Sequence, residues 1–147
     1  MSFLAQFSEG DNVGSIKAVS LAHKTWLTGV NPVAFISGKD WEDVDFVPEQ
    51  GQLQHNSRDT ENGTVYTYQV WFLFNKQNAA LFDAFKKYIG QTGILKVTDG
   101  NDVTSIIGTP QYPVTLTHAA DTGQAFAGLN YYRVNVTWES CEPAVLV

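Results

Sequence analysis

Residues 64–90, TVYTYQVWFLFNKQNAALFDAFKKYIG, decide the fold that the sequence predicts. In the first part of this stretch large apolar side chains recur at every second position, which is the period of a β-strand. The opposite face begins polar and ends with Trp71 and Leu73, so we expect the following helix or a second subunit to cover that end. The face that is apolar throughout is expected to lie in the core and consists of Tyr66, Tyr68, Val70, Phe72 and Phe74.

The second part of the stretch predicts one amphipathic helix over about residues 78–90. Its apolar residues recur with the spacing of a single helical face. Gly90 can end the helix, since glycine readily adopts the left-handed conformation found at helix ends. A helix of about 12 residues is marginal alone in water. We therefore expect Phe82 and Phe85 to attach it to the sheet.

Short strand patterns flank this stretch on both sides and are separated by Gly, Pro, Asp and Asn. In the last strand we expect Tyr132, Val134, Val136 and Trp138 to point inward. The predicted strands cover residues 16–27 (with a helix as the alternative), 33–36, 41–47, 64–74, 94–98, 103–107, 114–118 and 131–139. The pattern predicts a single α+β domain over residues 1–147, a mainly antiparallel β-sandwich or partly closed barrel with one helix.

Three further segments are suited to contacts with other chains. Residues 48–63 predict a long polar loop, which can be a mobile hairpin, an insertion arm or a contact loop. Residues 1–13 predict a flexible arm. Residues 141–147 end in an apolar tail that is either a C-terminal arm or a final strand of the domain's own sheet. The candidate interface residues are Trp71, Leu73, Leu53, Val145 and Leu146.

Charge and composition exclude several classes of function. The net charge is −6 with nine Lys and Arg, so the clustered cations that neutralise nucleic-acid phosphates are missing. Cys141 is the only cysteine, which excludes an intrachain disulfide and a Cys-rich zinc site. No run approaches the ~18 apolar residues of a membrane span. The N-terminal residues lack the order of a signal peptide, so we expect synthesis in the cytosol.

The sharpest catalytic motif is Asp121-Thr122-Gly123, the tripeptide of aspartic proteases. That chemistry needs two carboxylates sharing a proton, with an apolar strand leading into the Asp. Here the residues before Asp121 are His118, Ala119 and Ala120, which are not a strongly apolar strand. A turn in which the Asp side chain accepts backbone N–H bonds explains the motif as well. We therefore expect a protein that is not an enzyme, with the protease as a remote alternative.

Metal and ligand sites have weaker signals. Asp99, Asn101 and Asp102 lack the spacing of a calcium loop and fit a hairpin turn. His23, His55 and His118 are far apart and lack the spacing of metal ligands. We expect no metal and no cofactor, and no small-molecule substrate is evident. The four tryptophans, Trp26, Trp41, Trp71 and Trp138, leave a glycan- or ligand-binding β-domain as the second hypothesis.

The order of elements resembles the small β-rich virion proteins of tailed bacteriophages and prophages, in the tail-tube, tail-terminator and neck group. The resemblance is carried by WEDV at 41–44, GTVY at 63–66, LKVTDGND at 95–102, IGTP at 107–110 with YPV at 112–114, DTG at 121–123 and the strand 131–138. The ending is similar to that of uncharacterised prophage proteins of gut Bacteroidetes.

This resemblance implies a non-enzymatic tail or neck subunit that assembles into homo-oligomeric rings or tubes. Its partners would be copies of itself and other virion proteins, and its location would be the virion. Direct nucleic-acid binding and membrane contact are not expected. The resemblance carries over no binding residues.

Overall fold

The computed structural model describes residues 14–30, 33–47, 50–75, 79–122 and 131–146. Residues 1–13, the predicted flexible arm, lie outside the described part. The elements are β1 (Ile16–His23), the 3₁₀ turn η1 (Lys24–Trp26), β2 (Leu27–Val30), β3 (Val33–Phe35), β4 (Glu42–Val44), β5 (Gly51–Thr60), β6 (Gly63–Phe74), α1 (Ala79–Lys86), β7 (Gly90–Asp99), β8 (Thr104–Ile107), β9 (Val114–Asp121), β10 (Tyr131–Ser140) and β11 (Val145–Leu146).

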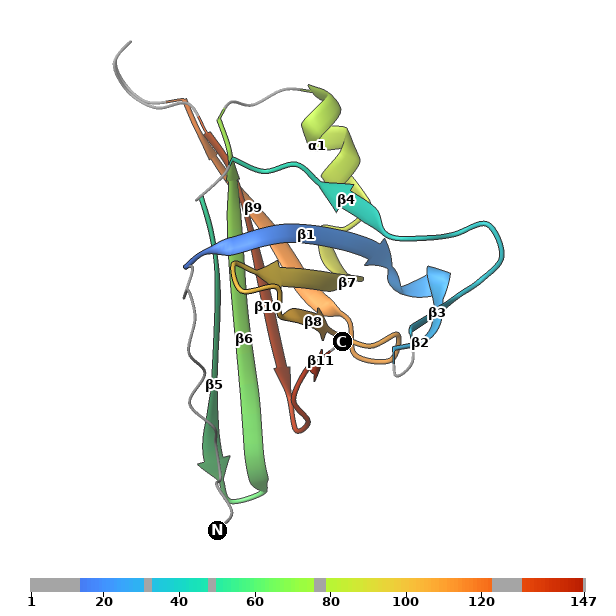
Figure 1. Ribbon diagram of the computed structural model, residues 1–147, viewed down its shortest axis with the longest axis vertical. Coiled ribbons are helices and arrows are strands. Elements are labelled where there is room, and N and C mark those ends of the chain that lie inside the picture. The colour runs from blue at the N-terminus through green and yellow to red at the C-terminus, as the bar shows by residue number, and fades with distance from the viewer. Residues whose placement is uncertain (1–13, 31–32, 48–49, 76–78, 123–130, 147) are drawn as a thin grey trace.

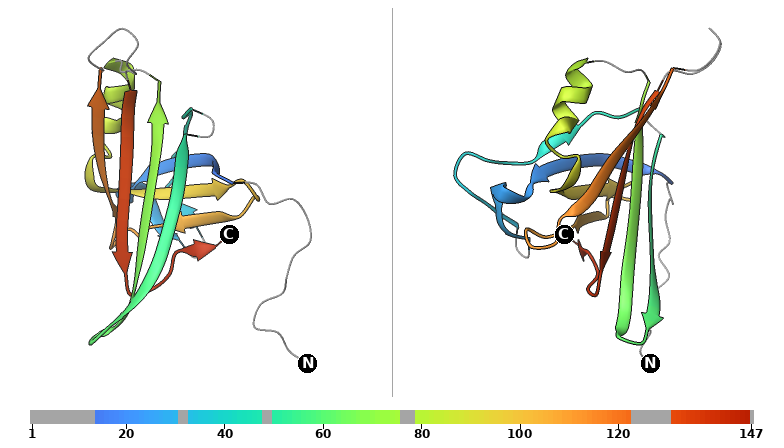
Figure 2. Two further views of the ribbon diagram at one scale, coloured as in Figure 1. Left: turned by 90° about the vertical axis from the view of Figure 1, so that its left-hand side faces the viewer. Right: turned by 180° about the vertical axis from the view of Figure 1, so that it is seen from behind.

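Nearly all strands belong to one antiparallel sheet that curls over on itself. Its path is β11-β8-β7-β9-β10-β6-β5; β1 joins it by pairing with β7, and β4 pairs with β1. Strands β5, β6, β10 and β9 run along the long axis of the molecule, while β1, β7 and β8 cross them (Figures 1 and 2). We call these two parts the long layer (β5, β6, β9 and β10) and the crossing layer (β1, β7 and β8). The core lies between the two layers. The predicted α+β class and partly closed barrel with one helix are therefore confirmed.

The curl occurs at β7, which pairs with three strands. Residues Gly93–Asp99 pair with β1, whereas the start of β7 pairs with β9 and its later part with β8. The ladder between β7 and β9 is irregular between Gly90 and Gly93. Gly90 has a backbone φ of +102°, which residues other than glycine rarely adopt. This irregular pairing lets the sheet turn from β9 of the long layer to β7 of the crossing layer.

The strand at the centre of the long layer, β6, places its residues as its alternation predicts. Tyr68, Val70 and Phe72 are buried, and Tyr66 and Phe74 pack against the same cluster. On β10 the four residues predicted to point inward are all buried: Tyr132, Val134, Val136 and Trp138.

A second cluster lies on the far side of the crossing layer. Ala22, Leu27, Ile94 and Ile106 are buried there, beneath the small sheet of β2 and β3. Trp26 is half-buried and packs against both clusters. Trp26 ends η1, and the residue before η1, His23, caps that turn because its side chain accepts the backbone N–H of Thr25. The predicted strand over residues 16–27 therefore ends at His23 and continues as a turn.

The helix is shorter than predicted. α1 ends at Lys86, and Tyr88 N–H donates to Phe85 O as the chain turns towards β7. Phe85 is buried as expected. Phe82 is 42% exposed, and its ring meets that of His118 on β9 edge-on, with 5.6 Å between the ring centres. Phe85 alone therefore makes the deep contact of the helix.

The predicted long polar loop over residues 48–63 is wrong for most of its length, because residues Gly51–Thr60 form strand β5. Of the alternatives for this segment, a hairpin is observed, since β5 pairs with β6 along its whole length. Most of β5 is exposed, so the alternation of apolar and polar residues that marks a strand is missing. Gly63, with a φ of +114°, closes the hairpin.

The C-terminal segment is not a free arm over its described part. Val145 and Leu146 form β11, which pairs with Ile106 and Ser105 of β8. The alternative of a final strand within the domain's own sheet is therefore the observed one.

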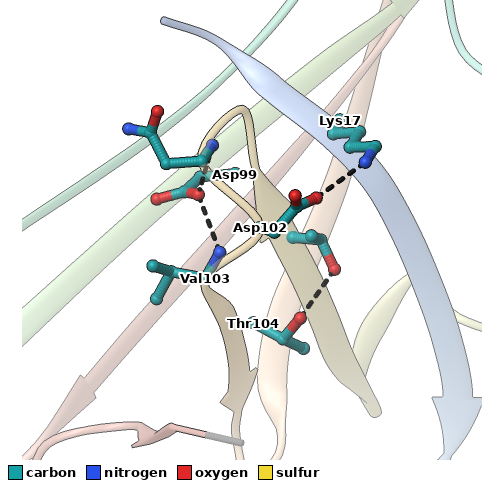
Figure 3. A network of polar contacts seen from close by, with 7 residues as sticks. Lys17, Asp99, Asp102, Val103 and Thr104 are labelled. Carbon is teal, nitrogen blue, oxygen red and sulfur yellow. Dashed lines mark hydrogen bonds and ion pairs between the residues drawn. The ribbon is translucent and has the colours of Figure 1, made fainter. Parts of the chain in front are cut away.

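The turn after β7 confirms the hairpin predicted there. Asp99 Oδ1 accepts the N–H groups of Asn101 and Val103, each at 2.9 Å, and Lys17 Nζ lies 2.6 Å from Asp102 Oδ1 (Figure 3). Below the turn the hydroxyls of Thr98 and Thr104 are 2.9 Å apart. The acidic side chains hold the turn together, as the hairpin interpretation requires.

Candidate interaction surface at the edge of the sheet

Strand β5 forms one edge of the sheet. It contains ten residues and follows β6 in a register without a bulge from Gly51↔Phe72 to Thr60↔Gly63. Within the described residues no strand pairs with its other side. Native edge strands are usually short, or are interrupted by proline, bulges or inward-pointing charges. β5 contains no proline and no bulge, and its two charged residues, Arg58 and Asp59, lie near its end, so it presents a long, regular backbone.

The register shows which backbone groups face outward from β5. Leu73 N–H donates to Gln50 O at 3.0 Å, whereas Gln50 N–H donates to Val47 O. The carbonyl of residue 50 therefore points towards β6. Because the residues that bond to a neighbouring strand alternate along an antiparallel ladder, we expect Gln52, Gln54 and Asn56 to bond to β6. The N–H and C=O groups of the odd-numbered residues between them point away from β6. The outward-facing set is Gly51, Leu53, His55, Ser57 and Asp59. Of these, Gly51 already has a partner, because its carbonyl accepts the Ser15 hydroxyl at 3.1 Å.

The tip of the hairpin extends beyond its neighbours. The pairing of β6 with β10 ends at Tyr66↔Ser140, and residues 58–65 continue as a two-stranded ribbon, as the lower end of Figure 1 shows. An isolated two-stranded ribbon is marginally stable in water. This one carries few apolar side chains, and all of its residues except half-buried Val65 are exposed.

The outer face of the long layer combines amides and hydroxyls with one tryptophan. Trp71 lies between strand neighbours on both sides: its Nε1 donates to Gln52 Oε1 at 3.2 Å, and the Arg133 guanidinium is 4.6 Å from the centre of its ring. Leu73 is beside it on β6. Because α1 packs against the opposite face through Phe85, the helix does not cover Trp71. The sequence predicted that either the helix or a second subunit covers this face. The helix does not, and the second subunit stays a prediction.

The five candidate interface residues are not brought together in one patch. Trp71 and Leu73 are half-buried on the outer face, and Leu53 on β5 is half-buried against the core. Val145 is half-buried and Leu146 is 69% exposed on β11, at the opposite end of the sheet path from β5. Only the first three belong to the long layer.

The outer face also contains a polar groove of about 550 Å³ between β6, β10 and the turn before β9. Tyr112 lies at this groove with 71% of its surface exposed. Its carbonyl accepts Trp138 Nε1 at 2.9 Å, and its N–H donates to Thr109 Oγ1 at 3.0 Å. Amides and hydroxyls form much of the lining: Thr67, Gln69, Gln91, Gln111, Thr115 and Thr137.

The motifs with catalytic or metal-binding potential do not converge. Among the residues that the structure describes, no group of three or more His, Cys, Asp or Glu side chains can hold a metal ion. Asp121 ends β9 and Thr122 follows it, whereas Gly123 lies outside the described residues. Cys141 is a free and exposed thiol.

No protein-family model, curated protein or solved structure matches the chain. Among the described residues, no helix has the length and apolar character needed to cross a membrane. The open edge of β5 and the groove beside Tyr112 were both missed at the level of sequence. The Asn62-Gly63 pair, a common turn signal, is the feature that could have revealed the hairpin.

Proposed function

We propose that this protein is a non-enzymatic structural subunit that assembles with copies of itself into rings or tubes, of the kind found in the tails and necks of tailed phages. The observation that carries the proposal is the long, regular edge of β5, with which no other described strand pairs. The phage setting, the virion location and the contacts with other virion proteins rest on the sequence resemblance. The open edge supports self-assembly independently of it.

Strand addition at β5 would pair at once the four outward-facing backbone positions from Leu53 to Asp59, which have no such partner among the described residues. Each backbone hydrogen bond contributes about 0.5–1.5 kcal/mol net, and extended segments commonly bind to sheet edges in this way. The exposed hairpin tip and half-buried Trp71 would lie beside the added strand. A neighbour would thus cover the part of the sheet that the chain's own described residues leave open.

A second free edge favours rings over simple dimers. β9 pairs with β7 only at Val114 and Leu116, so residues 117–121 have a strand partner on one side alone within the described part. Because neighbouring strands of the long layer alternate in direction, β5 of one subunit would meet β9 of the next as antiparallel strands. Such head-to-tail contacts close into rings or continue as tubes.

Proline substitution on β5 tests this proposal. Ser57→Pro removes an outward N–H and keeps the ladder to β6, so we expect assembly to be lost while the monomer stays folded. Ser57→Ala keeps the N–H and should assemble like the natural protein. Sedimentation velocity would detect species at multiples of the 16.2 kDa subunit. A natural protein that stays monomeric at high concentration, or a Ser57→Pro variant that assembles normally, would overturn the proposal.

Glycan binding is the second candidate function, and the groove beside Tyr112 is the observation that favours it. Sugars are bound by hydrogen-bonding amides and hydroxyls together with an aromatic ring that contacts their C–H groups, and all three occur here. A glycan array should then show binding that is kept in Tyr112→Phe and lost in Tyr112→Ala. Equal signals from both variants would exclude the groove.

A further inference from the structure

A separate pocket of about 390 Å³ lies beside α1, on the side of the helix that faces β4 and the end of β6. We call it the helix pocket. Its volume falls in the range of about 300–1,000 Å³ that is usual for small-ligand sites. Leu21, Phe85 and Tyr88 in its wall are at most 5% exposed, so this part of the wall belongs to the packed core. The apolar lining is Leu21, Val44, Phe74, Leu81, Ala84, Phe85 and Tyr88.

Carboxylates on and just after β4 form the opposite wall. Glu42 is already engaged, because its Oε1 accepts from Lys87 Nζ and from the Tyr88 hydroxyl, each at 2.5 Å. Asp43 uses Oδ1 to accept the Ser20 hydroxyl at 2.7 Å, which leaves its second oxygen available. Asp45 has no hydrogen bond or ion pair with any described residue.

The charge balance of this wall is therefore uneven. Lys87 compensates Glu42, whereas neither Asp43 nor Asp45 forms an ion pair within the described residues. An anionic ligand would be repelled by these two carboxylates. A neutral apolar ligand would take water from them without replacing its hydrogen bonds, which costs free energy. A ligand with one positive group avoids both penalties.

We propose that the helix pocket binds a small organic amine. The apolar part of the ligand packs against Leu81, Phe85 and Phe74. Its ammonium group donates hydrogen bonds to Asp45 and to the free oxygen of Asp43. This assignment departs from the sequence analysis, where no small-molecule substrate is evident, and it does not depend on assembly through β5.

Three matched probes test the charge preference directly. They are 2-phenylethylamine, 2-phenylethanol and 3-phenylpropanoate, which share the aromatic body and carry a positive, a neutral and a negative end. In an NMR titration of the full chain we expect the amine to shift amide signals of α1 and β4. Charge-assisted hydrogen bonds predict that it binds roughly tenfold or more tightly than the alcohol. The carboxylate should cause no shift.

Two substitutions with the same change of net charge test the site. Asp45→Asn should weaken amine binding to the level of the alcohol. Asp83→Asn, on α1 but outside the pocket lining, should leave it unchanged. Ala84→Leu fills the pocket from an exposed helix position and should block both ligands. Because the aspartate pair removes only a carboxylate charge, it decides the question even if Ala84→Leu fails to fold.

The proposal is overturned if the amine causes no shift at millimolar concentration. It is also overturned if the alcohol binds as tightly as the amine, or if the two aspartate substitutions weaken the amine equally. The titration is repeated in the Ser57→Pro variant, so that a result on the pocket stays independent of the result on assembly.

Discussion

Replacing Phe72 with alanine should destabilise the protein more than almost any other single substitution. Phe72 is fully buried at the centre of β6, and its ring centre is 6.0 Å from those of Phe46, Phe74 and Phe85. Loss of a buried Phe side chain costs about 3–5 kcal/mol. Since whole domains are stable by about 5–15 kcal/mol, this is a large fraction of the total.

The expected magnitude can be measured by thermal and urea denaturation. For a chain of this size each kcal/mol lowers Tm by roughly 2–4 °C, so Phe72→Ala should lower Tm by roughly 6–20 °C. Leu73→Ala is the matched control, because Leu73 is adjacent on the strand, faces the other way and is only half-buried. If both substitutions cost the same, the assignment of the two faces of β6 is wrong.

The same experiment reaches the helix through a double-mutant cycle. Phe72 and Phe85 are in ring contact across the interface between sheet and helix, and aromatic pairs couple by about 0.5–1.5 kcal/mol. The double variant should therefore lose less than the sum of the two single variants. Strict additivity would mean that α1 does not pack where the structure places it.

The remaining predictions concern pH and the hairpin. Burial raises the pKa of Glu42, but hydrogen bonds from Lys87 and Tyr88 outweigh it and lower the pKa below 4.5. Glu42 therefore stabilises the fold above pH 4.5, and the advantage of the natural protein over Glu42→Gln in urea denaturation should disappear as the pH falls through the lowered value. Burial and the hydrogen bond to Glu42 raise the pKa of Tyr88 above 10. The contribution of Tyr88 to the free energy of unfolding should therefore be lost as the pH rises above 10. A Tyr88→Phe variant whose stability falls in the same way at alkaline pH would contradict this. Gly63→Ala should cost about 1–2 kcal/mol by denaturation, because its φ is +114° although no neighbour is within 4 Å; equal loss in Gly14→Ala, which also meets no atom within 4 Å, would refute the conformational reason.

The sequence predicted the elements whose burial leaves a periodic trace. On β6 and β10 one face is buried and the other is not, so alternation revealed both the strand and its orientation. The turn at Asp99 was recognisable because its side-chain chemistry is local. These features depend on residues close together in the chain.

Features without a periodic trace were missed. β5 is exposed along most of its length, since it forms an edge, and a polar strand resembles a loop in sequence. α1 ends early because tertiary contacts of Tyr88, which is 2% exposed, turn the chain back into the core. The helix pocket is lined by residues from β1, β4, β6 and α1. Because these elements are far apart in the sequence, no local sequence pattern can predict the pocket.

Residue-resolved hydrogen exchange along β5 tests the central claim most directly. Exchange is started in concentrated and in dilute protein, quenched, and read after dissociation. Pairing at the open edge predicts that concentration protects the outward amides of Leu53, His55 and Ser57. Those of Gln54 and Asn56, already bonded to β6, should change much less. Equal exchange of the outward amides at both concentrations would contradict assembly through β5.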